Sequence, residues 1–314
     1  MNMKRKLLVL TASLALAGFS SISSAQEIYI PLISKGFQHQ FWQAVKQGAE
    51  QAGKDLKVKV TFEGPETEQQ VDKQIDMLSA ALAKKPSAIA LAALDSKAAI
   101  PLLKKAQAAN IPVIAFDSGV DSDIVLTTAQ TNSKAAASLA ADMMAKKIGG
   151  EGEVAVIGHD QTSTTGTDRR DGFVDQIKAK YPKIKVVDIQ YGGGDHLKSA
   201  EIAKTLMQAH PKLKGIFGTN EGSAIGAGKG MKEAKKSGVI IIGFDSGKAQ
   251  KDMINDGTIA GAITQNPVGI GYKTVEAAVK ALKGEKLPKI IDTGFYYYDK
   301  SNMKDAKIAA VLYD

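Results

Sequence analysis

The sequence predicts an α/β protein made of two doubly wound lobes, each built on a parallel sheet. Short β-rich runs alternate with longer segments of helical period, which is typical of βαβ units. The β-rich runs are apolar on both faces, as expected for strands that helices cover on each side. The pattern restarts at 153–159, after a Gly-rich segment at 146–153, which indicates a second lobe.

Ten runs are predicted as strands because each is short, rich in β-forming residues and bounded by polar or turn residues. About ten strand-helix units are more than one open sheet comfortably holds, and 314 residues exceed the usual size of a single core. A single closed barrel of eight units is a minor alternative that this length permits. The predicted strands are 27–33, 57–64, 88–94, 111–117, 123–129, 153–159, 185–191, 215–220, 239–245 and 261–266, and the helices between them include 41–56, 70–84, 97–109, 133–148 and 199–210.

The first 25 residues have the features of a secretory signal peptide. Basic residues at 4–6 precede an apolar run at 7–19, and small residues end at Ala25. The apolar run is shorter than the roughly 20 residues that a membrane-spanning helix needs. We therefore expect cleavage after Ala25, with a membrane anchor or a buried helix as the less favoured alternative.

The composition is that of an ordinary globular protein, with 44% hydrophobic residues, 24% charged residues and no Cys. It excludes a disordered, collagen-like or disulfide-stapled chain. The formal net charge is +8, and cleavage of the signal peptide would remove three of the positive charges. An exported protein without Cys has no disulfides and carries no lipid on an N-terminal Cys. We expect a freely soluble protein of the periplasm, and secretion into the medium is the weaker option.

Polar and aromatic side chains follow most of the predicted strands. Ligands of open α/β sheets bind beyond the carboxyl ends of the strands, so these side chains are candidates for a binding site. Carboxylates, amides and guanidinium forks together suit a ligand with many hydroxyls, and aromatic rings suit the C–H face of a sugar ring. The candidates are Lys35, Gln38, His39, Phe41, Trp42, Asp117, Ser118, Arg169, Arg170, Asn220, Glu221, Asp245, Gln265 and Asn266.

Each candidate also has a purely structural explanation. Asp, Asn and Ser after a strand commonly form turns or helix N-caps, and Phe41 and Trp42 could simply pack in a core. Paired lysines near predicted helix ends, such as 84–85 and 235–236, are interpreted as solvated faces. The recurrence of polar residues at many strand ends favours a binding site.

Motifs for metal, nucleotide and nucleophile chemistry are weak in this sequence. The histidines are far apart and Cys is absent, which argues against a zinc site and excludes a thiol nucleophile. The Gly-rich segment 222–231 has Ser223 where a phosphate loop needs its first Gly, and Gly230 where it needs Ser or Thr. No G-x-S-x-G elbow is present. We expect no metal, no cofactor and no nucleic-acid partner.

Six segments occur in the order typical of a known family: KGFQHQFW (35–42), IPVIAFD (111–117), TDRRDGF (167–173), QAHPKLKGIFGTNEGSAIGA (208–227), VIIIGFD (239–245) and AGAITQNPVGIGY (260–272). With them the chain resembles the periplasmic sugar-binding proteins of ABC importers, in particular the ribose- and allose-binding type. The resemblance spans essentially the whole chain after the signal peptide. The effector domains of lactose-repressor-like regulators share the fold but begin with a DNA-binding headpiece, where this chain has the predicted signal peptide.

The resemblance implies the type I periplasmic binding protein fold, in which two Rossmann-like lobes are joined by a three-segment hinge. A sugar would be enclosed in the cleft, with hinge closure on binding. The N-terminal lobe would comprise 26–131 with 266–293, and the C-terminal lobe 132–265 with 294–314.

The resemblance also implies roles for individual residues. Phe41 and Trp42 would stack on the sugar, and Asp117 would accept hydrogen bonds from two hydroxyls. Lys35 stands where the allose-binding type uses a lysine. The remaining polar contacts would come from Arg169, Asn220 and Asp245 of the second lobe and from the hinge-side amide of Gln265.

Three positions depart from the ribose-binding pattern. His39 stands where that type has Asn, Ser118 where it has Arg, and Gly194 where it has a Phe that closes over the sugar. Loss of an arginine fork and an aromatic face should reshape the pocket, because a hydroxyl left unpaired in a buried site strongly changes discrimination. We therefore expect a ligand other than ribose.

The expected function is capture of a monosaccharide, a pentose, a hexose or a related polyol, by a monomeric solute receptor that delivers it to the membrane permease of an ABC importer. A signalling receptor is the alternative, with a closed form read by a chemoreceptor or sensor kinase and a ligand that need not be a sugar. An exported enzyme is the third hypothesis, and it would need paired carboxylates flanking a bond.

Overall fold

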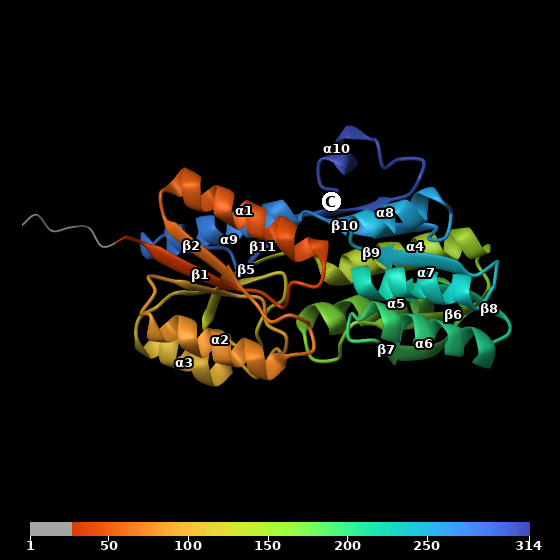
Figure 1. The fold of residues 1–314 in the computed structure, drawn as a ribbon, viewed down its shortest axis with the longest axis horizontal. Helices are drawn as coiled ribbons and strands as arrows, with labels where there is room; N and C mark the ends of the chain where they lie inside the picture. The colour runs from red at the N-terminus through yellow and green to blue at the C-terminus, as the bar shows by residue number, and fades with distance from the viewer. Residues whose placement is uncertain (1–26) are drawn as a thin grey trace, which may run out of the picture.

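The computed structural model describes residues 27–314 and contains two α/β lobes that lie end to end (Figure 1). The predicted signal peptide and its cleavage site lie outside the described residues. Each lobe is a six-stranded sheet with helices on both faces. The predicted fold class, two doubly wound lobes with parallel sheets, is confirmed.

The first sheet has the strand order β11-β5-β4-β3-β1-β2, and all of its neighbouring strands are parallel. Alternate residues of β1 point to opposite faces of this sheet. Ile30 and Leu32 pack with α1 and α9, whereas Ile33 packs with α2 and α3. The elements of this lobe are β1 (Tyr29–Ile33), α1 (Gln40–Leu56), β2 (Lys59–Glu63), α2 (Val71–Ala83), β3 (Ile89–Leu91), α3 (Ile100–Ala108), β4 (Val113–Phe116), β5 (Val125–Gln130), α9 (Pro267–Leu282) and β11 (Ile290–Asp292).

The second sheet has the strand order β12-β10-β9-β8-β6-β7, and only its edge strand β12 is antiparallel to its neighbour. Helices α4 and α5 cover one face, and α6 and α7 cover the other. The elements are α4 (Ser133–Ile148), β6 (Gly152–Gly158), α5 (Thr164–Lys180), β7 (Ile184–Tyr191), α6 (His196–Ala209), β8 (Leu213–Gly218), α7 (Glu221–Glu233), β9 (Ile240–Phe244), α8 (Lys248–Asn255), β10 (Gly261–Gln265), β12 (Phe295–Tyr298) and α10 (Ala306–Ala309).

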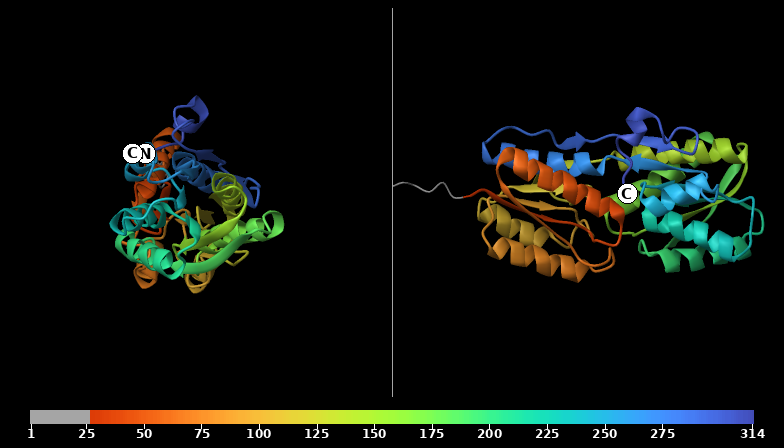
Figure 2. Two further views of the ribbon diagram at one scale, coloured as in Figure 1. Left: turned by 90° about the vertical axis from the view of Figure 1, so that its right-hand side faces the viewer. Right: turned by 45° about the horizontal axis from the view of Figure 1, so that its top comes forward.

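The chain crosses between the sheets three times, after β5, after β10 and after β11. The first two crossings lead directly into helices whose N-caps are Asn132 and Asn266. The third contains Gly294 at a φ of 78°, in the left-handed region that favours glycine. Figure 2 shows the C-terminus back at the junction of the lobes. There the Tyr313 hydroxyl accepts the backbone N–H of Ser246 at 3.1 Å.

The ten predicted strands are present as β1 to β10, with ends shifted by a few residues. Strands β11 and β12 were not predicted, because both are short and half exposed and therefore lack an apolar run. Within residues 27–314, no helix is both long enough and apolar enough to cross a bilayer.

Close packing of α1 on α9 leads to a stability prediction for Gly271. A Cβ atom at Gly271 would collide with the carbonyl oxygen of Val45 on α1, and backbone atoms have little room to move. We expect Gly271→Ala to lower the free energy of unfolding by about 2 kcal/mol, despite the better helix propensity of Ala. Gly119→Ala is the control, because the nearest atoms to its Cβ lie 3.8 Å away. Equal thermal unfolding midpoints for the two variants would contradict the packing argument.

Candidate functional site

A cavity lined by residues of both lobes lies between them, at the carboxyl ends of the parallel strands. This is the place where open α/β sheets bind ligands. The lining residues are Lys35, His39, Phe41, Trp42, Glu68, Asp117, His159, Thr165, Arg169, Asn220, Asp245 and Gln265.

Two aspartates occupy equivalent positions in the two lobes. Asp117 directly follows β4 and Asp245 directly follows β9. The local sequences are also alike, AFDS at 115–118 and GFDS at 243–246. Both have a positive φ, 55° and 78°, which is rare for residues other than glycine. Each backbone N–H donates to a neighbouring strand, at 2.8 Å for Asp117 and 2.6 Å for Asp245. Such strain clusters at functional sites, where the surrounding structure holds it in place.

Asp117 faces a guanidinium group across the cavity. The Nη2 atom of Arg169 lies 3.8 Å from Oδ1 of Asp117, and both side chains are almost completely buried. Burial raises the pKa of Asp117 to about 6, although the positive charges of Arg169 and Lys35 oppose the shift. The Arg169 guanidinium stacks on the ring of Phe244 at 3.8 Å and donates to the carbonyl of Thr219 at 3.0 Å. Arg169 is therefore held rigidly with its fork at the cavity.

Asp245 is oriented by two donors from its own lobe. The side-chain amide of Gln265 donates to Oδ1 at 2.7 Å, and the backbone N–H of Glu221 donates to Oδ2 at 3.0 Å. Asn220 is the N-cap of α7, so its Oδ1 accepts the backbone N–H of Ser223 and its amide nitrogen faces the cavity. The second lobe thus presents a fixed carboxylate and two amides.

The aromatic residues Phe41 and Trp42 come from the first turn of α1. Their rings meet edge to face with centroids 5.0 Å apart, and both also belong to the core of the first lobe. The indole N–H of Trp42 donates to Oε1 of Glu68 at 2.7 Å. Burial alone would raise the pKa of Glu68, but the positive charge of Lys35 and the hydrogen bond from Trp42 help to hold it below its usual value. An ionised Glu68 therefore fixes the orientation of the indole.

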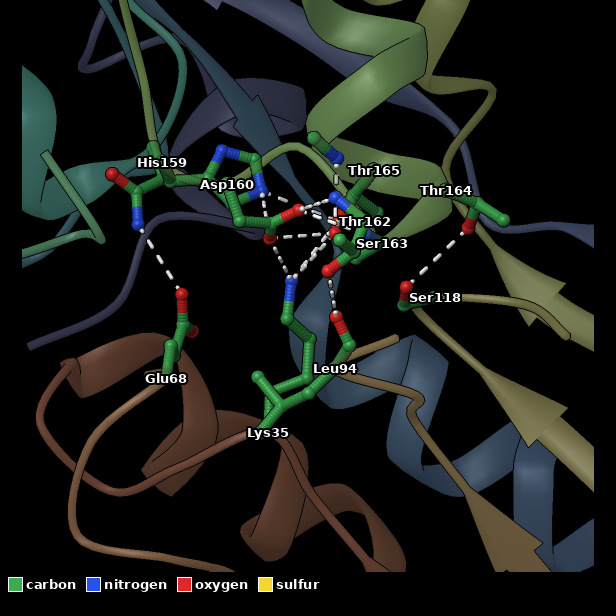
Figure 3. Close-up of polar contacts among 12 residues, drawn as sticks. Lys35, Glu68, Leu94, Ser118, His159, Asp160, Thr162, Ser163, Thr164 and Thr165 are labelled. Atoms are coloured by element: carbon green, nitrogen blue, oxygen red, sulfur yellow. Dashed lines mark hydrogen bonds and ion pairs between the residues drawn. The ribbon is translucent and has the colours of Figure 1, made fainter. Parts of the chain in front are cut away.

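Lys35 follows β1 and reaches across to the other lobe (Figure 3). Its Nζ atom donates to Asp160 at 3.3 Å, to Ser163 at 3.1 Å and to Thr165 at 3.2 Å. Burial would lower the pKa of Lys35, yet the carboxylates around it, led by Asp160, raise it above the usual value. An ammonium group has three donors, and all three of these are used across the cleft. Lys35 therefore joins the lobes while its stem lines the cavity.

Several buried polar atoms at the cavity have no hydrogen-bond partner among the described residues. They are Nε of Arg169, Nδ1 of His39 and Oε1 of Gln265. An unpaired buried donor or acceptor costs about 1 to 3 kcal/mol, so native proteins seldom leave one without a function. The three atoms include donors and an acceptor, which suits hydroxyl groups that can serve as either.

Nine of the fourteen candidate residues line this cavity, and the other five do not: Gln38, Ser118, Arg170, Glu221 and Asn266. The Ser118 hydroxyl instead lies 3.3 Å from that of Thr164, on the other side of the strand end (Figure 3). Gly194 borders an adjoining hollow together with His39, and its φ of 69° explains the absence of a side chain there. Within residues 27–314, no group of three or more His, Asp or Glu side chains is placed to hold a metal ion.

Three lining residues were not among the predicted site residues. His159 directly follows β6 and Glu68 follows β2, so the strand-end argument would have found both had it been applied to every strand. Burial lowers the pKa of His159 to about 3, although Asp160 opposes the shift, and its ring is therefore neutral. Thr165 lies in the first turn of α5, and the sequence offers no specific signal for it.

The chain belongs to the periplasmic binding protein domain family, which it matches over residues 30–286. It is 29% identical to the ribose import binding protein of Escherichia coli K12 over 287 residues, 91% of this chain and 95% of that protein. It is similar to a carbohydrate transporter solute-binding protein from Agrobacterium radiobacter, crystallised with D-arabinose, with 37% identity, a TM-score of 0.88 and coverage of 92% and 100% of the two chains. A solute-binding protein from Agrobacterium vitis with bound D-fucose matches with 36% identity, a TM-score of 0.87 and coverage of 91% and 100%.

The contact between Lys35 and Asp160 leads to a prediction about the two lobes in solution. A double-mutant cycle of Lys35→Met and Asp160→Asn should give a coupling energy of about 1 to 3 kcal/mol in thermal unfolding, because each single variant leaves a buried charge without its partner. The exposed pair Lys134 and Asp175, 3.2 Å apart, is the control and should give less than about 1 kcal/mol. A coupling energy near zero for Lys35 and Asp160 would show that the lobes do not touch there.

Proposed function

We propose that this protein captures a monosaccharide in the cleft between its lobes and delivers it to the permease of an ABC importer. One observation carries the proposal: the cavity between the lobes combines two strained aspartates, a stacked arginine and amides with the rings of Phe41 and Trp42. Family membership supports the same function, because the relatives are sugar-binding proteins of transporters.

The polar groups of the cavity match the hydroxyls of a sugar. Each carboxylate accepts from two adjacent hydroxyls, and the Arg169 fork donates to hydroxyl or ring oxygens. Phe41 and Trp42 provide an apolar surface for the C–H groups of the ring. A sugar in this position would satisfy the unpartnered atoms of Arg169, His39 and Gln265.

The two-lobe architecture supports capture by hinge closure. Polar contacts from one lobe to the other surround the cavity, among them those of Lys35 with Asp160 and of Asp117 with Arg169. Three crossing segments allow the lobes to separate about a hinge and admit the sugar. We place the boundaries at 131/132, 265/266 and 293/294, and strand membership of the two sheets supports this division. Export to the periplasm through cleavage after Ala25 is part of the proposal.

The ligand class that we propose is a pentose, a hexose or a related polyol, with ribose disfavoured. Gly194 and Ser118 stand where the ribose-binding pattern has an aromatic residue and an arginine, so this chain lacks the contacts that those two side chains would make with ribose. D-Arabinose and D-fucose, the sugars bound by two similar solute-binding proteins, are the first sugars to test.

We also propose that the protein is not an enzyme. Asp117 faces Arg169, and Asp245 already accepts from Gln265 and from the backbone of Glu221. Carboxylates held in this way act as hydrogen-bond acceptors for hydroxyls, whereas glycoside cleavage needs one carboxyl to deliver a proton. The curated relatives support this part of the proposal, because they are named as binding proteins.

The test of the proposed function uses Trp42, the only tryptophan of the chain. The protein is first unfolded and refolded to remove any co-purified sugar. A panel of pentoses, hexoses, deoxysugars and polyols is then titrated while Trp42 fluorescence is followed. We expect a saturable change with at least one sugar, at a dissociation constant of about 1 μM or below. No response in fluorescence or in thermal shift across the panel would overturn the sugar proposal.

Two substitutions test the site itself. Asp117→Ala and Arg169→Ala should each weaken binding of the responsive sugar by at least about 100-fold, because each removes a charged hydrogen bond and leaves its partner buried and unpaired. Arg170→Ala is the matched control, since the neighbouring Arg170 binds Asp171 and does not line the cavity. Isothermal calorimetry measures all three variants. Near-normal affinity in Asp117→Ala or Arg169→Ala would remove that residue from the site.

A further inference from the structure

Two helices begin at the junction of the lobes, and neither has an N-terminal cap from its own neighbours. The N-cap of α1 is His39, whose side chain makes no capping hydrogen bond, and the first turn of α1 has no acidic residue. The N-cap of α8 is Gly247, which has no side chain, and its first turn also lacks an acidic residue. The first backbone N–H groups of a helix need acceptors, and the positive end of the dipole favours an anion.

The missing acceptor for α1 comes from the other lobe. Glu221 is the first residue of α7, and its carboxyl group lies close enough to the backbone N–H groups of Gln40 and Phe41 for them to favour its charged form. Gln40 and Phe41 are the first two residues of α1. Glu221 is only 4% exposed, so this contact lies inside the closed junction.

The acceptor for the start of α8, in the second lobe, is a side chain of the first lobe. The backbone N–H of Lys248, the first residue of α8, donates to the side-chain oxygen of Gln40 at 2.7 Å. A Cβ atom at Gly247 would lie 2.6 Å from Oε1 of Glu221 and 2.8 Å from Oε1 of Gln40. Because Gly247 has no side chain, the carboxyl group of Glu221 and the side chain of Gln40 both fit beside it. Glu221 of the second lobe thus lies at the start of α1, and Gln40 of the first lobe lies at the start of α8.

Glu221 also connects the two halves of the candidate sugar site. Its backbone N–H donates to Asp245 at 3.0 Å in the second lobe. Its carboxyl group holds the first turn of α1, which carries Phe41 and Trp42 in the first lobe. Displacement of Glu221 would therefore move an acceptor and an aromatic surface of the site relative to each other.

The surroundings of the Glu221 carboxyl group are acidic. Asp245 at the end of β9 and Glu68 after β2 both disfavour its negative charge, and its Oε2 atom has no hydrogen-bond partner among the described residues. Tyr298 of β12 and Tyr313 of the C-terminal segment are the other titratable groups that interact with it, and both are uncharged at neutral pH. The cations of the cavity face other acids: Lys35 binds Asp160, and Arg169 faces Asp117.

We propose that Glu221 and Gln40 are positioning residues whose reciprocal helix caps form only when the lobes close, and that closure on a sugar takes up one proton on Glu221. The inference rests on the proposed function, because it concerns closure around a sugar. It deepens that function by adding a pH-dependent step to capture.

The direction of the pH effect follows from burial. Burial, followed by repulsion from Asp245, raises the pKa of Glu221 to about 8 when the lobes are in contact, although the backbone N–H groups of Gln40 and Phe41 oppose the shift. In the open form the carboxyl group faces water and returns toward its ordinary value near 4.3. Between these values only the closed form binds the proton, so closure becomes less favourable as the pH rises toward 8 and is independent of pH above it.

The first experiment measures affinity at pH 7 and pH 9, using the panel sugar with the largest saturable Trp42 response. We expect the wild-type protein to bind it about tenfold more weakly at pH 9 than at pH 7. Glu221→Gln imitates the protonated carboxyl group, so its affinity at pH 7 should stay near that of the wild type and change less than about twofold by pH 9. Glu233→Gln is the matched control at the other end of α7, where the exposed carboxyl group of Glu233 pairs with Lys204, and it should keep the wild-type pH dependence.

The second experiment counts protons by calorimetry at pH 7 in buffers of different ionisation enthalpy. The wild type and Glu233→Gln should take up close to one proton per sugar bound, and Glu221→Gln should take up none. Gln40→Ala removes the cap of α8 but no titratable group, so it should weaken binding about fivefold at both pH values and keep the proton uptake.

The outcomes separate the two proposals. If a sugar binds with no proton uptake, or if Glu221→Gln keeps the wild-type pH dependence, the role of Glu221 is wrong and sugar capture stands. If Gln40→Ala binds as well as the wild type, the reciprocal caps do not contribute to closure. If no sugar of the panel binds the wild type, the proposed function fails and the proton-linked step fails with it.

Discussion

Charged side chains are buried at the junction of the lobes, and each has its partner of opposite charge on the other lobe. Lys35 on the first lobe is paired with Asp160 on the second, and Arg169 on the second faces Asp117 on the first. A buried charge without a partner costs several kcal/mol, whereas each of these groups is solvated when the cleft is open. These pairs therefore stabilise the arrangement in which the two lobes are in contact.

The scaffold supplies the precision that such a site requires. Parallel sheets bring the carboxyl ends of many strands to one edge, and two such edges face each other across the cleft. Asp117 and Asp245 are held in the left-handed region directly after β4 and β9, so their carboxylates leave the strand in a direction that ordinary extended backbone does not permit. Rigid core strands on one side and a strained turn on the other keep the acceptors in place before a ligand arrives.

The junction is held by more than side-chain charge. The backbone ends of α1 and α8 are completed by Glu221 and Gln40 from the opposite lobes, and Tyr313 contacts both lobes where the chain ends. These contacts depend on the relative position of the lobes to within a few tenths of an ångström, because hydrogen bonds weaken steeply with distance and angle. In the arrangement that the structure shows, the aromatic and acidic groups of the two lobes line one cavity.

The sequence alone determined the class of fold, because ten apolar runs alternating with helical periods allow few arrangements other than doubly wound parallel sheets. It also identified most of the cavity, since Asp117, Asn220 and Asp245 lie within two residues of the ends of strands that must meet at one sheet edge. Only the tertiary structure decided that Lys35 donates its hydrogen bonds to the other lobe and that the Ser118 hydroxyl contacts Thr164 and does not line the cavity. It also decided that β11 and β12 belong to different sheets. Hydrophobic periodicity is a local property of the chain, whereas the partner of a buried charge or of a helix end lies in a distant part of the sequence, as for Lys35 and Asp160, which are 125 positions apart.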